Sequence, residues 1–553
     1  MPHVDRRTFL KGSLAAAGAT FIIGVSGREV LGANEVIRVG VAGIRGRGGG
    51  HIGEFLRIPE VRIAYLIDID KQTFGSRRGT IEKKLLDEAR REYLAKLPEA
   101  DRKARQEADQ AHKKHAGLIK KLGKRKPEEL TDEQKQELAA ARAAESEYAA
   151  QSKALAAQLR KGIEAQVPIC VQDVRKALDD KDLAAISIAT PNHWHALMTI
   201  WACQAGKDVY VEKPCSHNIF EGRKAVEAAR KYKRIVQHGT QSRSDGKWAR
   251  LAAIARSGKL GKVLVSHGIA SKPRGGIGHK KPGTPPAHID FNLWLGPAQR
   301  VPYHANLVHY NWHWFWDFGC GEIGNQGVHQ MDLARWMIPD ATWPTAVVSM
   351  GGRFVWGDQG ETPNTQLTVF EFGDSLLVFE NCNLTDGKTR RVDNDVYFEA
   401  GRVVGGSRFY PKDSDKAASL PKVDFKLGPG RGPFGNFIEC VKSRKAEDLN
   451  ADILEGHYSS GLCHLGNTSY RLGKDLPFAQ TGIFPDRSFA AGRWEDLKKL
   501  LSQRRKVNLG QTPCRVGRRL KFDGKNEKFV DCPEADKLLT RDYRPPFVVP
   551  EEV

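Results

Sequence analysis

The sequence predicts an α/β domain of the Rossmann type with a helical insertion, followed by an α+β domain with a mostly antiparallel sheet. Three observations predict this fold class. A β-branched run ends in a glycine-rich turn at 43–50, which is typical of a first strand leading into a dinucleotide-binding turn. Apolar runs then alternate with helical patterns up to residue 239, as in parallel βαβ units. From 346 to 399, short strand-like runs are separated by Gly-Asp and Asp-Gly turns.

Length and composition bound the class of protein. With 553 residues, 40% of them hydrophobic, the chain is long enough for two or three domains with real cores. The formal net charge is +21, but the positive charge is spread along the chain and no nucleic-acid-binding motif occurs. We therefore expect no nucleic-acid partner. The nine cysteines form no Cys-x-x-Cys pair, so we expect no metal site.

The first 33 residues are expected to be a twin-arginine signal peptide. Arg6-Arg7-Thr8-Phe9-Leu10-Lys11 resembles the export motif, and a small-residue, apolar stretch follows at 14–25. That stretch is too short and too interrupted for a membrane span, so we expect no stable span after cleavage near Ala33. The alternative is an uncleaved N-terminus. Export by this route implies a folded protein that works in the periplasm or another extracytoplasmic space.

The glycine-rich turn is predicted to bind a dinucleotide. Glycines permit a tight turn and let backbone N–H groups approach a pyrophosphate at a helix N-terminus. Aligned on Gly43 and Gly48, the middle glycine of the usual fingerprint is Arg45, whose side chain must point away from the phosphates or contact them. A second strand, 61–67, leads to Asp68, at the position of the acid that bonds the adenine ribose. Its carboxylate repels a 2′-phosphate, which favours NAD over NADP.

Residues 78–165 are predicted to be a helical insertion. The composition changes there to Ala, Lys, Arg, Glu and Gln with few aromatics. Prolines at 98 and 127 break the pattern, and Thr131-x-x-Gln134 is a capping box that opens a long helix. We expect two or three long helices, most simply an antiparallel hairpin. It is either a charged, solvent-exposed arm or a contact for an oligomer or another partner.

The stretch 190–214 is predicted to build the active site. Thr190-Pro191-Asn192 ends a buried strand at 184–189, and Glu212-Lys213-Pro214 leaves the next strand at 208–211. Ligands of open α/β sheets bind beside the carboxyl ends of strands, so both segments arrive at one crevice. A lysine there can protonate or polarise a substrate oxygen, and the proline fixes the backbone that presents it.

These two segments together, Thr190-Pro191-Asn192-His193-Trp194-His195 and Glu212-Lys213-Pro214, resemble the glucose–fructose oxidoreductase / inositol dehydrogenase / MocA family. Residues 291–297 are similar to a segment of its secreted, twin-arginine-exported branch. The resemblance implies hydride transfer between NAD and a hydroxyl of a sugar, polyol or glycoside. It also implies a large open-faced sheet in the second domain and a homo-oligomer, a dimer or a tetramer. The expected domains are 34–245 for NAD, 246–480 for substrate and oligomer contacts, and 481–553 as a basic extension.

The segment 324–336 matches the catalytic helix of the family. That helix supplies an acid and, four residues later, a histidine that exchanges the proton of the sugar hydroxyl. His329 matches the histidine, whereas Asn325 stands in place of the acid and cannot relay a proton. On a regular helix Asp332 shares their face, so it either partly substitutes for the acid or is a structural partner. Lys213 is expected to bond the reacting hydroxyl while His329 acts as acid and base.

An aromatic cluster at 309–318 suits a carbohydrate pocket, although core packing of about half of it is expected. Two other functions stay open. In one, NAD is retained and recycled, giving net glycoside cleavage or sugar–sugar redox exchange. In the other, the protein binds sugar without catalysis, which Asn325 and Arg45 favour. The expected cofactor site comprises Gly43, Arg45, Gly46, Arg47, Gly48, Asp68, Thr190, Pro191, Asn192, His195, Glu212, Lys213 and Gln241.

Overall fold

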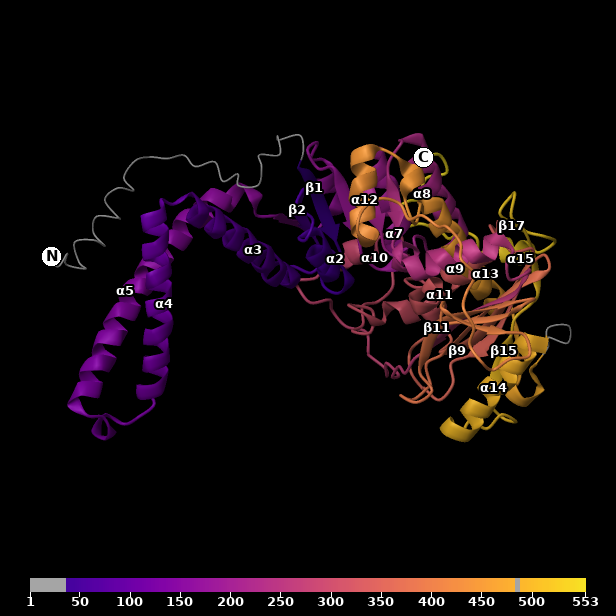
Figure 1. Cartoon of the computed structure of the whole chain (residues 1–553). Helices are drawn as coiled ribbons and strands as arrows, with labels where there is room; N and C mark the ends of the chain where they lie inside the picture. The colour runs from indigo at the N-terminus through magenta and orange to yellow at the C-terminus, as the bar shows by residue number, and fades with distance from the viewer. Residues whose placement is uncertain (1–35, 483–487) are drawn as a thin grey trace. The chain divides into compact units, whose positions relative to one another are not determined.

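The computed structural model describes residues 36–482 and 488–553, and it confirms the predicted fold class (Figure 1). The chain separates into two compact units. The smaller is built around residues 75–169, and the larger contains residues 170–553 with two segments that precede residue 75. The predicted signal peptide, residues 1–33, lies outside the described residues. Within the described ranges, no helix combines the length and the apolar character needed to cross a bilayer.

Six parallel strands form the first sheet, in the order β3-β2-β1-β4-β5-β6. Strands β4 and β5 consist wholly of buried residues, as expected of parallel strands covered on both faces. The strand order reverses between β1 and β4, which creates the crevice where such sheets bind ligands. The elements are β1 (Ile37–Ala42), α2 (Arg47–Phe55), β2 (Val61–Ile67), β3 (Ile169–Val171), α6 (Val174–Leu178), β4 (Ala185–Ile188), α7 (Asn192–Gln204), β5 (Asp208–Val211), α8 (Ile219–Lys231), β6 (Val236–His238) and α9 (Gly246–Ser257).

The second sheet is large and mostly antiparallel. Its central order is β13-β12-β11-β7-β10-β9-β8-β15-β14. In the described chain, β10 and β7 pair in parallel, and the other neighbours in this order pair antiparallel. The strands are β7 (Val263–Ser271), β8 (Ala346–Gly352), β9 (Thr365–Phe372), β10 (Ser375–Cys382), β11 (Arg391–Phe398), β12 (Gly401–Val404), β13 (Arg408–Pro411), β14 (Lys474–Pro477), β15 (Pro513–Val516), β16 (Leu520–Asp523) and β17 (Lys528–Phe529).

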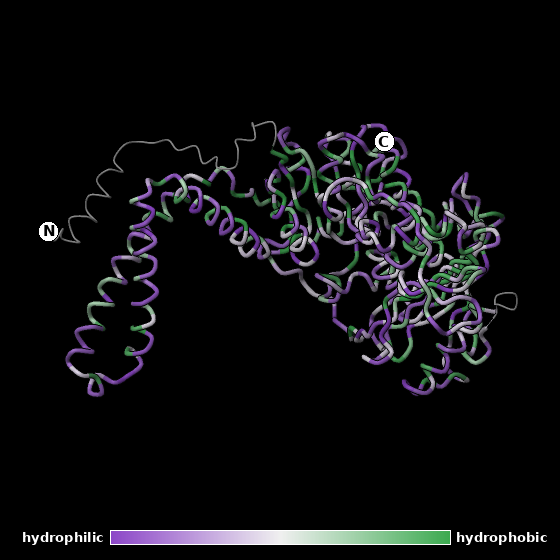
Figure 2. Tube along the Cα trace, viewed as in Figure 1, coloured by the Kyte–Doolittle hydropathy of each residue, from purple (hydrophilic) through white to green (hydrophobic). Residues whose placement is uncertain are grey.

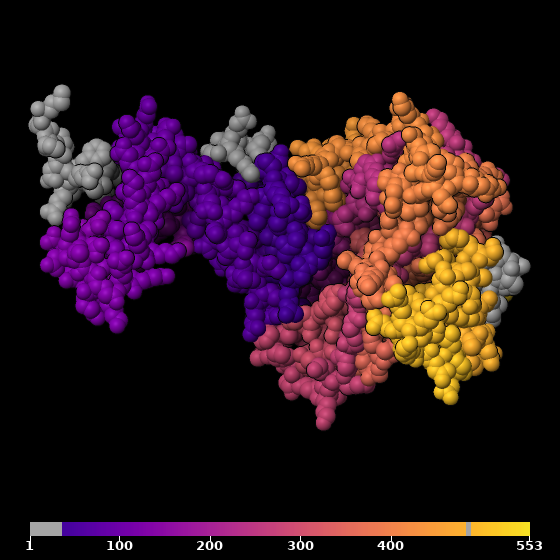
Figure 3. All heavy atoms as spheres, turned by 60° about the horizontal axis from the view of Figure 1, so that its bottom comes forward, coloured from indigo at the N-terminus to yellow at the C-terminus, as the bar shows by residue number. Residues whose placement is uncertain are grey.

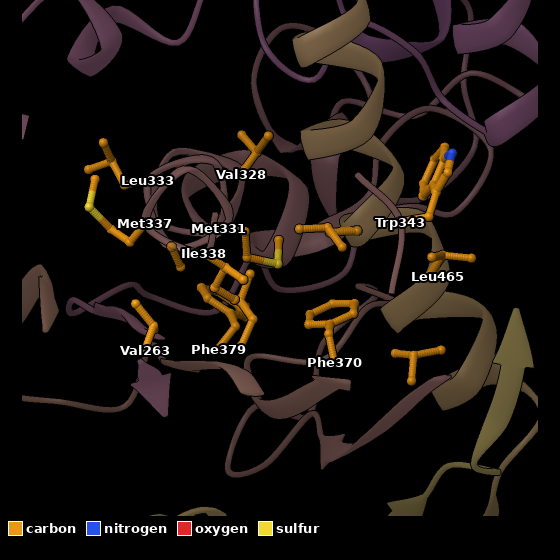
Figure 4. Packing of buried hydrophobic residues seen from close by; sticks show 14 of the residues in the cluster. Val263, Val328, Met331, Leu333, Met337, Ile338, Trp343, Phe370, Phe379 and Leu465 are labelled. Carbon is orange, nitrogen blue, oxygen red and sulfur yellow. The ribbon is translucent and has the colours of Figure 1, made fainter. Parts of the chain in front are cut away.

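One face of the second sheet holds the main core of the larger unit. Helices α11 (Val328–Met337) and α13 (Ile453–Arg471) pack on this face. Met331 of α11 lies in the same buried cluster as Phe370 and Phe379 of the sheet (Figure 4). This packing holds α11 in place, so it also fixes the segment just before α11 that carries candidate site residues. Helices α10 (Phe291–Leu295), α12 (Gly432–Ser443) and α15 (Pro533–Asp536) complete this part.

Part of the other face of the second sheet is covered by helix α14 of the C-terminal extension, which the sequence predicted only as a basic extension. Helix α14 (Ser488–Arg505) places Trp494 and Leu497 in one buried cluster with Met350 and Leu367 of the sheet. Strands β15 and β16 of the extension pair with β8. Figure 3 shows these C-terminal residues, in yellow, against the orange residues that precede them in the chain. The extension is therefore an integral part of the second sheet domain.

The smaller unit is helical, as predicted for the insertion. Helices α4 (Glu99–Leu122) and α5 (Asp132–Ile163) form a hairpin, and α3 (Gln72–Lys96) precedes them. The capping box is confirmed, because the Thr131 hydroxyl accepts from the Gln134 N–H at 3.2 Å and the Gln134 side chain accepts from the Thr131 N–H at 3.2 Å. Figure 2 shows mostly hydrophilic residues along the hairpin. Both predicted roles of this insertion, an exposed arm or a partner contact, stay predictions.

Candidate active site

A cavity of about 650 Å³ lies within the larger unit, at the carboxyl ends of strands of the first sheet. It brings together most of the residues expected at the site. Gly48 and Asp332 are the two expected residues that do not line it. The expected residues that line it are Gly43, Arg45, Gly46, Arg47, Asp68, Thr190, Pro191, Asn192, His195, Glu212, Lys213, Gln241, Asn325 and His329.

The turn between β1 and α2 requires glycine at two positions. Gly43 has φ +77°, and a Cβ there would lie 2.5 Å from the carbonyl oxygen of Ala189. A Cβ at Gly48 would lie 2.3 Å from the carbonyl oxygen of Gly43, so Gly48 closes the turn from behind rather than lining the cavity. Arg45 is exposed at the cavity edge. Helix α2 has no side-chain cap and no acidic residue in its first turn, so its N-terminal N–H groups stay available to an anion.

Asp68 lies at the end of β2, with its carboxylate against the turn. Its two oxygens accept from the backbone N–H groups of Ile44 at 2.9 Å and Asp70 at 3.0 Å. Burial raises the pKa of Asp68 to about 6, although these backbone bonds act in the opposite direction. A carboxylate oxygen has more than one lone pair, so Asp68 can still accept from a ligand in the cavity.

Glu212 lines the cavity and contacts three other polar side chains, those of Arg47, His51 and Gln241. Its Oε1 accepts from Arg47 Nε at 2.7 Å and from Gln241 Nε2 at 3.1 Å, and the His51 ring lies 3.0 Å away through Nε2. The other nitrogen of His51 is 2.7 Å from Ser187 Oγ. Burial alone would raise the pKa of Glu212, but its bond with His51 and the charge of Arg47 hold that pKa well below its usual range.

His51 is a site residue that the sequence did not predict. It is buried one helical turn after Arg47 on α2, and both contact Glu212. The i, i+4 spacing of Arg47 and His51, directly after the glycine turn, is the signal that could have revealed it. His195 was expected only as a cofactor contact, but it also has a structural role. Its two ring nitrogens lie 2.8 Å from the carbonyl oxygen of Thr190 and 2.5 Å from that of Pro214. It therefore joins the two polar segments that form the wall.

Lys213 points from the end of β5 toward the segment before α11. Its Nζ donates to the backbone carbonyl of Asn325 at 2.6 Å. Burial lowers the pKa of Lys213, while the carboxylates of Glu212 and Glu322 raise it in part. His329 lines the same cavity, and burial together with the positive charge of Lys213 lowers its pKa to about 3. His329 is therefore neutral at neutral pH.

The segment before α11 departs from a regular helix, and this changes the predicted grouping of side chains. Residues 323–327 form a π-helical turn, whose extra residue changes the angle between Asn325 and the residues of the regular helix that follows. Asn325 and His329 line the cavity, but Asp332 does not share their face. Asp332 is buried and accepts from Arg243 Nε at 2.9 and 3.0 Å and from Ser459 Oγ at 2.7 Å. Of the two roles considered for Asp332, this geometry is that of a structural partner.

Glu322 is a second residue that the sequence did not predict. It is fully buried and accepts from the Asn325 side-chain amide at 3.2 Å.

The aromatic cluster at 309–318 divides between the cavity and the core, as expected. His309, Tyr310 and Trp312 line the cavity, whereas residues such as Trp314 lie in a neighbouring core. Among the described residues, no group of three His, Cys, Asp or Glu side chains is arranged to hold a metal ion.

Comparisons with known proteins agree with this geometry. A model described as "Oxidoreductase family, NAD-binding Rossmann fold" matches residues 116–240, and one described as "Oxidoreductase family, C-terminal alpha/beta domain" matches 274–490. Both describe one family and together span more than half of the chain. The chain belongs to the glucose–fructose oxidoreductase / inositol dehydrogenase / MocA family. Its first sheet is thus the NAD-binding Rossmann domain of that family.

Individual relatives match shorter parts. The uncharacterized oxidoreductase YrbE of Bacillus subtilis is 30% identical over 232 residues, which are 41% of this chain and 57% of the relative. Inositol 2-dehydrogenase of Salmonella typhimurium is 34% identical over 97 residues, 17% of this chain and 29% of the relative. The solved WlbA dehydrogenase of Bordetella pertussis, in complex with NADH and UDP-GlcNAcA, is 14% identical with a TM-score of 0.47, covering 78% of this chain and 97% of that one. The matched part of the chain thus spans 57% of the length of the first of these curated relatives and 29% of the second.

Proposed function

We propose that the protein is an NAD-dependent oxidoreductase that transfers hydride between a nicotinamide cofactor and a hydroxyl of a sugar, polyol or glycoside. One observation carries the proposal. Lys213, a half-buried lysine, and His329, a neutral histidine, line the same cavity as the glycine turn at Gly43 and the Asp68 carboxylate. Proton-handling groups and a dinucleotide-binding turn thus share one enclosed space. Inositol and levoglucosan dehydrogenases among the relatives support the carbohydrate class of substrate.

The residues fit a nicotinamide dinucleotide. The glycine turn and the uncapped N-terminus of α2 offer N–H groups to a pyrophosphate. Asp68 is placed for ribose hydroxyls, and its negative charge favours NAD over NADP. Near the other end of the cavity, Thr190 Oγ1 and Asn192 Oδ1 are buried and lack a hydrogen-bond partner in the described part of the chain. Orphaned buried polar atoms are costly, so these two atoms suit the polar groups of a bound nicotinamide half.

The residues of this chain divide the acid–base work. The bound nicotinamide supplies the hydride acceptor or donor. Lys213 donates a hydrogen bond to the reacting oxygen and holds it in place. The neutral ring of His329 accepts the hydroxyl proton and returns it in the reverse direction. The Asn325 side chain does not carry a proton, but the backbone carbonyl of Asn325 accepts a hydrogen bond from the Lys213 ammonium. The aromatic faces of Tyr310 and Trp312 offer a stacking surface for a sugar.

Absorbance and mass spectrometry of the nucleotide in the purified protein test this proposal. We expect co-purified or readily bound NAD(H) and a change in nicotinamide absorbance when a panel of sugars and polyols is added. A protein that binds no NAD would contradict the proposal. A protein that binds NAD and sugar without any redox signal would instead be the non-catalytic binding protein.

A second candidate function is favoured by one contact. The Asp70 carboxylate lies 2.7 Å from His288 Nδ1 and 3.1 Å from His309 Nε2. The backbone adds bonds from Lys71 N–H to the His288 carbonyl and from Asp290 N–H to the Ile69 carbonyl, both 3.0 Å. His309 and Asp68 line the same cavity, so the contacts of Asp70 hold the segments that carry His288 and His309 against the expected adenosine end. This clamp slows cofactor exchange and suits an enzyme that recycles retained NAD in glycoside cleavage or sugar–sugar exchange.

We also propose twin-arginine export to the periplasm or another extracytoplasmic space, and a dimeric or tetrameric assembly. Fractionation of cells that express the chain with Arg6 and Arg7 changed to lysine tests the first, since loss of export is the expected result. Light scattering of the purified protein tests the second. Because α14 covers part of the second sheet, contacts between copies would use the part of this sheet that α14 leaves open.

A further inference from the structure

Two cations share a single buried carboxylate at the edge of the candidate active site. Lys272 and Arg274 follow the end of β7. Lys272 Nζ lies 3.5 Å and Arg274 NH2 lies 3.3 Å from the carboxylate of Glu322. The Glu322 side chain is 0% exposed, whereas the side chains of Lys272 and Arg274 are 21% and 20% exposed. The two cations are the partly exposed partners of a buried carboxylate, and they adjoin the cavity through its lining residues Tyr310 and Asn325 without lining it themselves.

These cations are connected to the proton-handling residues. The carboxylate of Glu322 accepts from the Asn325 side-chain amide at 3.2 Å, and the Asn325 carbonyl accepts from Lys213 Nζ at 2.6 Å. On its other side, Arg274 NH1 donates to the Tyr310 hydroxyl at 2.7 Å, and Tyr310 lines the cavity. One continuous set of contacts thus runs from the reacting end of the cavity to Arg274.

The charges in this region do not balance. Glu212 is engaged by Arg47 and the His51 ring. Three other cations lie near Glu322: Lys213, Lys272 and Arg274. Apart from Glu212, Glu322 is the carboxylate that interacts with these three cations in the described chain. Half-buried cations are stabilised when a partner of opposite charge completes the set. A neutral sugar would leave this positive excess in place, whereas an anionic substituent would offset it, and guanidinium groups bind carboxylate and phosphate well.

We propose that the substrate is an anionic sugar, one that carries a carboxylate or a phosphate, and that Lys272 and Arg274 bind the anionic group. This inference rests on the proposed function, because it places the sugar hydroxyl at Lys213 and His329. It assigns Arg274 and Lys272 as specificity-determining residues. The charged substituent would lie on the side of the sugar that faces Tyr310.

Equilibrium binding of three related sugars to the NAD-loaded full chain tests the inference. The probes are glucose, glucuronate and glucose 6-phosphate. We expect at least one anionic sugar to bind about tenfold or more tightly than glucose, as a hydrogen bond to a charged group implies. The two anionic probes distinguish a carboxylate from a phosphate. High salt should reduce the difference while leaving the affinity for glucose nearly unchanged.

Variants separate charge recognition from a structural effect. Arg274→Gln should remove most of the preference for the anionic sugar and leave glucose binding within about twofold. Lys272→Gln should do the same to a smaller extent, and Arg274→Lys, which keeps the charge, should retain part of the preference. The matched control is Arg519→Gln, which removes an exposed arginine paired with Glu371 in the same domain. The control should change neither affinity.

Two results would overturn the inference: glucose that binds as tightly as both anionic sugars, or an Arg274→Gln variant that loses glucose and anionic sugar equally. Failure of the proposed function looks different. In that case the protein binds no NAD, or no sugar changes the nicotinamide absorbance, whatever its charge. Thermal unfolding of each variant shows whether the removal of one cation beside Glu322 has altered the folded state.

Discussion

The ammonium group of Lys213 donates a 2.6 Å hydrogen bond to the backbone carbonyl of Asn325. This bond joins the end of β5 in the first sheet to the π-helical turn before α11, which packs on the second sheet. The family position of an acid is filled here by an amide, but the lysine uses the backbone of that residue and not its side chain. The amide side chain is left to contact Glu322. Lys213 is therefore held by a contact that does not need an acid at position 325.

The first prediction concerns Lys213. Lys213→Ala should lower kcat/KM by about a hundredfold to ten-thousandfold, because it removes the donor that polarises the reacting oxygen. NAD should still bind, with at most a modest loss of affinity from this one expected cofactor contact, since the glycine turn and Asp68 are untouched. Steady-state kinetics with the best sugar of the panel and mass spectrometry of bound nucleotide measure both. The matched control is Lys442→Ala, which removes an exposed lysine. Equal activity of Lys213→Ala and wild type would refute the mechanism.

Glu322 is predicted to be a positioning residue. Its charge raises the pKa of Lys213 against the effect of burial, so Glu322→Gln should lower that pKa further. The alkaline limb of the kcat/KM pH profile, where Lys213 loses its proton, should move to lower pH. A residue that only supports packing would reduce activity without moving this limb. The profile of Glu361→Gln, a change at a carboxylate that does not contact Asn325, should coincide with that of wild type.

The sequence located Lys213, Glu212 and Asn192 because each follows directly from a strand end, and strand ends are readable from apolar runs and short motifs. Glu322 and His51 were not found because their meaning depends on partners far away in the chain. His51 acquires its role only through Glu212, 161 residues away. Local chemistry is visible in a sequence, whereas the pairing of distant polar side chains requires the fold.

The structure differs from the sequence-based predictions in two further places, the turn before α11 and the C-terminal extension, and both differences have physical causes. The π-helical turn at 323–327 cannot be inferred from apolar spacing, and it changes the angle between Asn325 and the two α11 residues His329 and Asp332. The C-terminal extension was predicted as a tail because its overall charge is basic. Yet Trp494, Leu497 and Leu501 recur at helical spacing and are buried on the second sheet. The apolar pattern was present, but the surrounding lysines and arginines obscured it.

Asp332 is predicted to stabilise the fold without taking part in proton transfer. Its ion pair with Arg243 is buried on both sides, with side-chain exposures of 1% and 5%. Asp332→Asn leaves Glu455 as the remaining carboxylate partner of Arg243, so the loss of the charged hydrogen bonds should cost about 1.5–3 kcal/mol in the free energy of unfolding. The exposed pair of Asp475 and Arg515 gives the matched control, and Asp475→Asn should cost about 1 kcal/mol or less.

Denaturant unfolding measures both changes. The kcat per folded molecule of Asp332→Asn should stay within a few-fold of wild type under conditions where the variant remains folded. A loss of the size expected for Lys213→Ala, in a variant that is fully folded, would show that Asp332 acts in catalysis after all.

Asp68 should make the stability of the cofactor-free protein depend on pH. Burial raises its pKa to about 6 in the folded state, against ~3.9 for an unfolded aspartate. The folded state therefore binds the proton more tightly, so the contribution favours folding below pH ~4 and is lost as pH rises through about 6. The loss is of order 2–3 kcal/mol. Asp68→Asn lacks this titration, so the difference in unfolding free energy between variant and wild type should change across that window and be flat above it.

The last prediction tests the clamp at Asp70. Asp70→Asn replaces the carboxylate between His288 and His309 by an amide, which weakens both contacts. Because His309 lines the same cavity as Asp68, NAD should dissociate about tenfold faster from the variant, as expected when two hydrogen bonds to a charged group weaken. Displacement of bound NADH, followed by its fluorescence, measures the rate. Asp173 also lines the cavity, but its carboxylate is paired with Arg175 and has no hydrogen bond to His288 or His309 among the described residues, so Asp173→Asn should match the rate of wild type. An enzyme that recycles retained NAD should then depend on added NAD only in the Asp70→Asn variant. Equal dissociation from both variants would remove the support for a retained cofactor and leave the simple dehydrogenase.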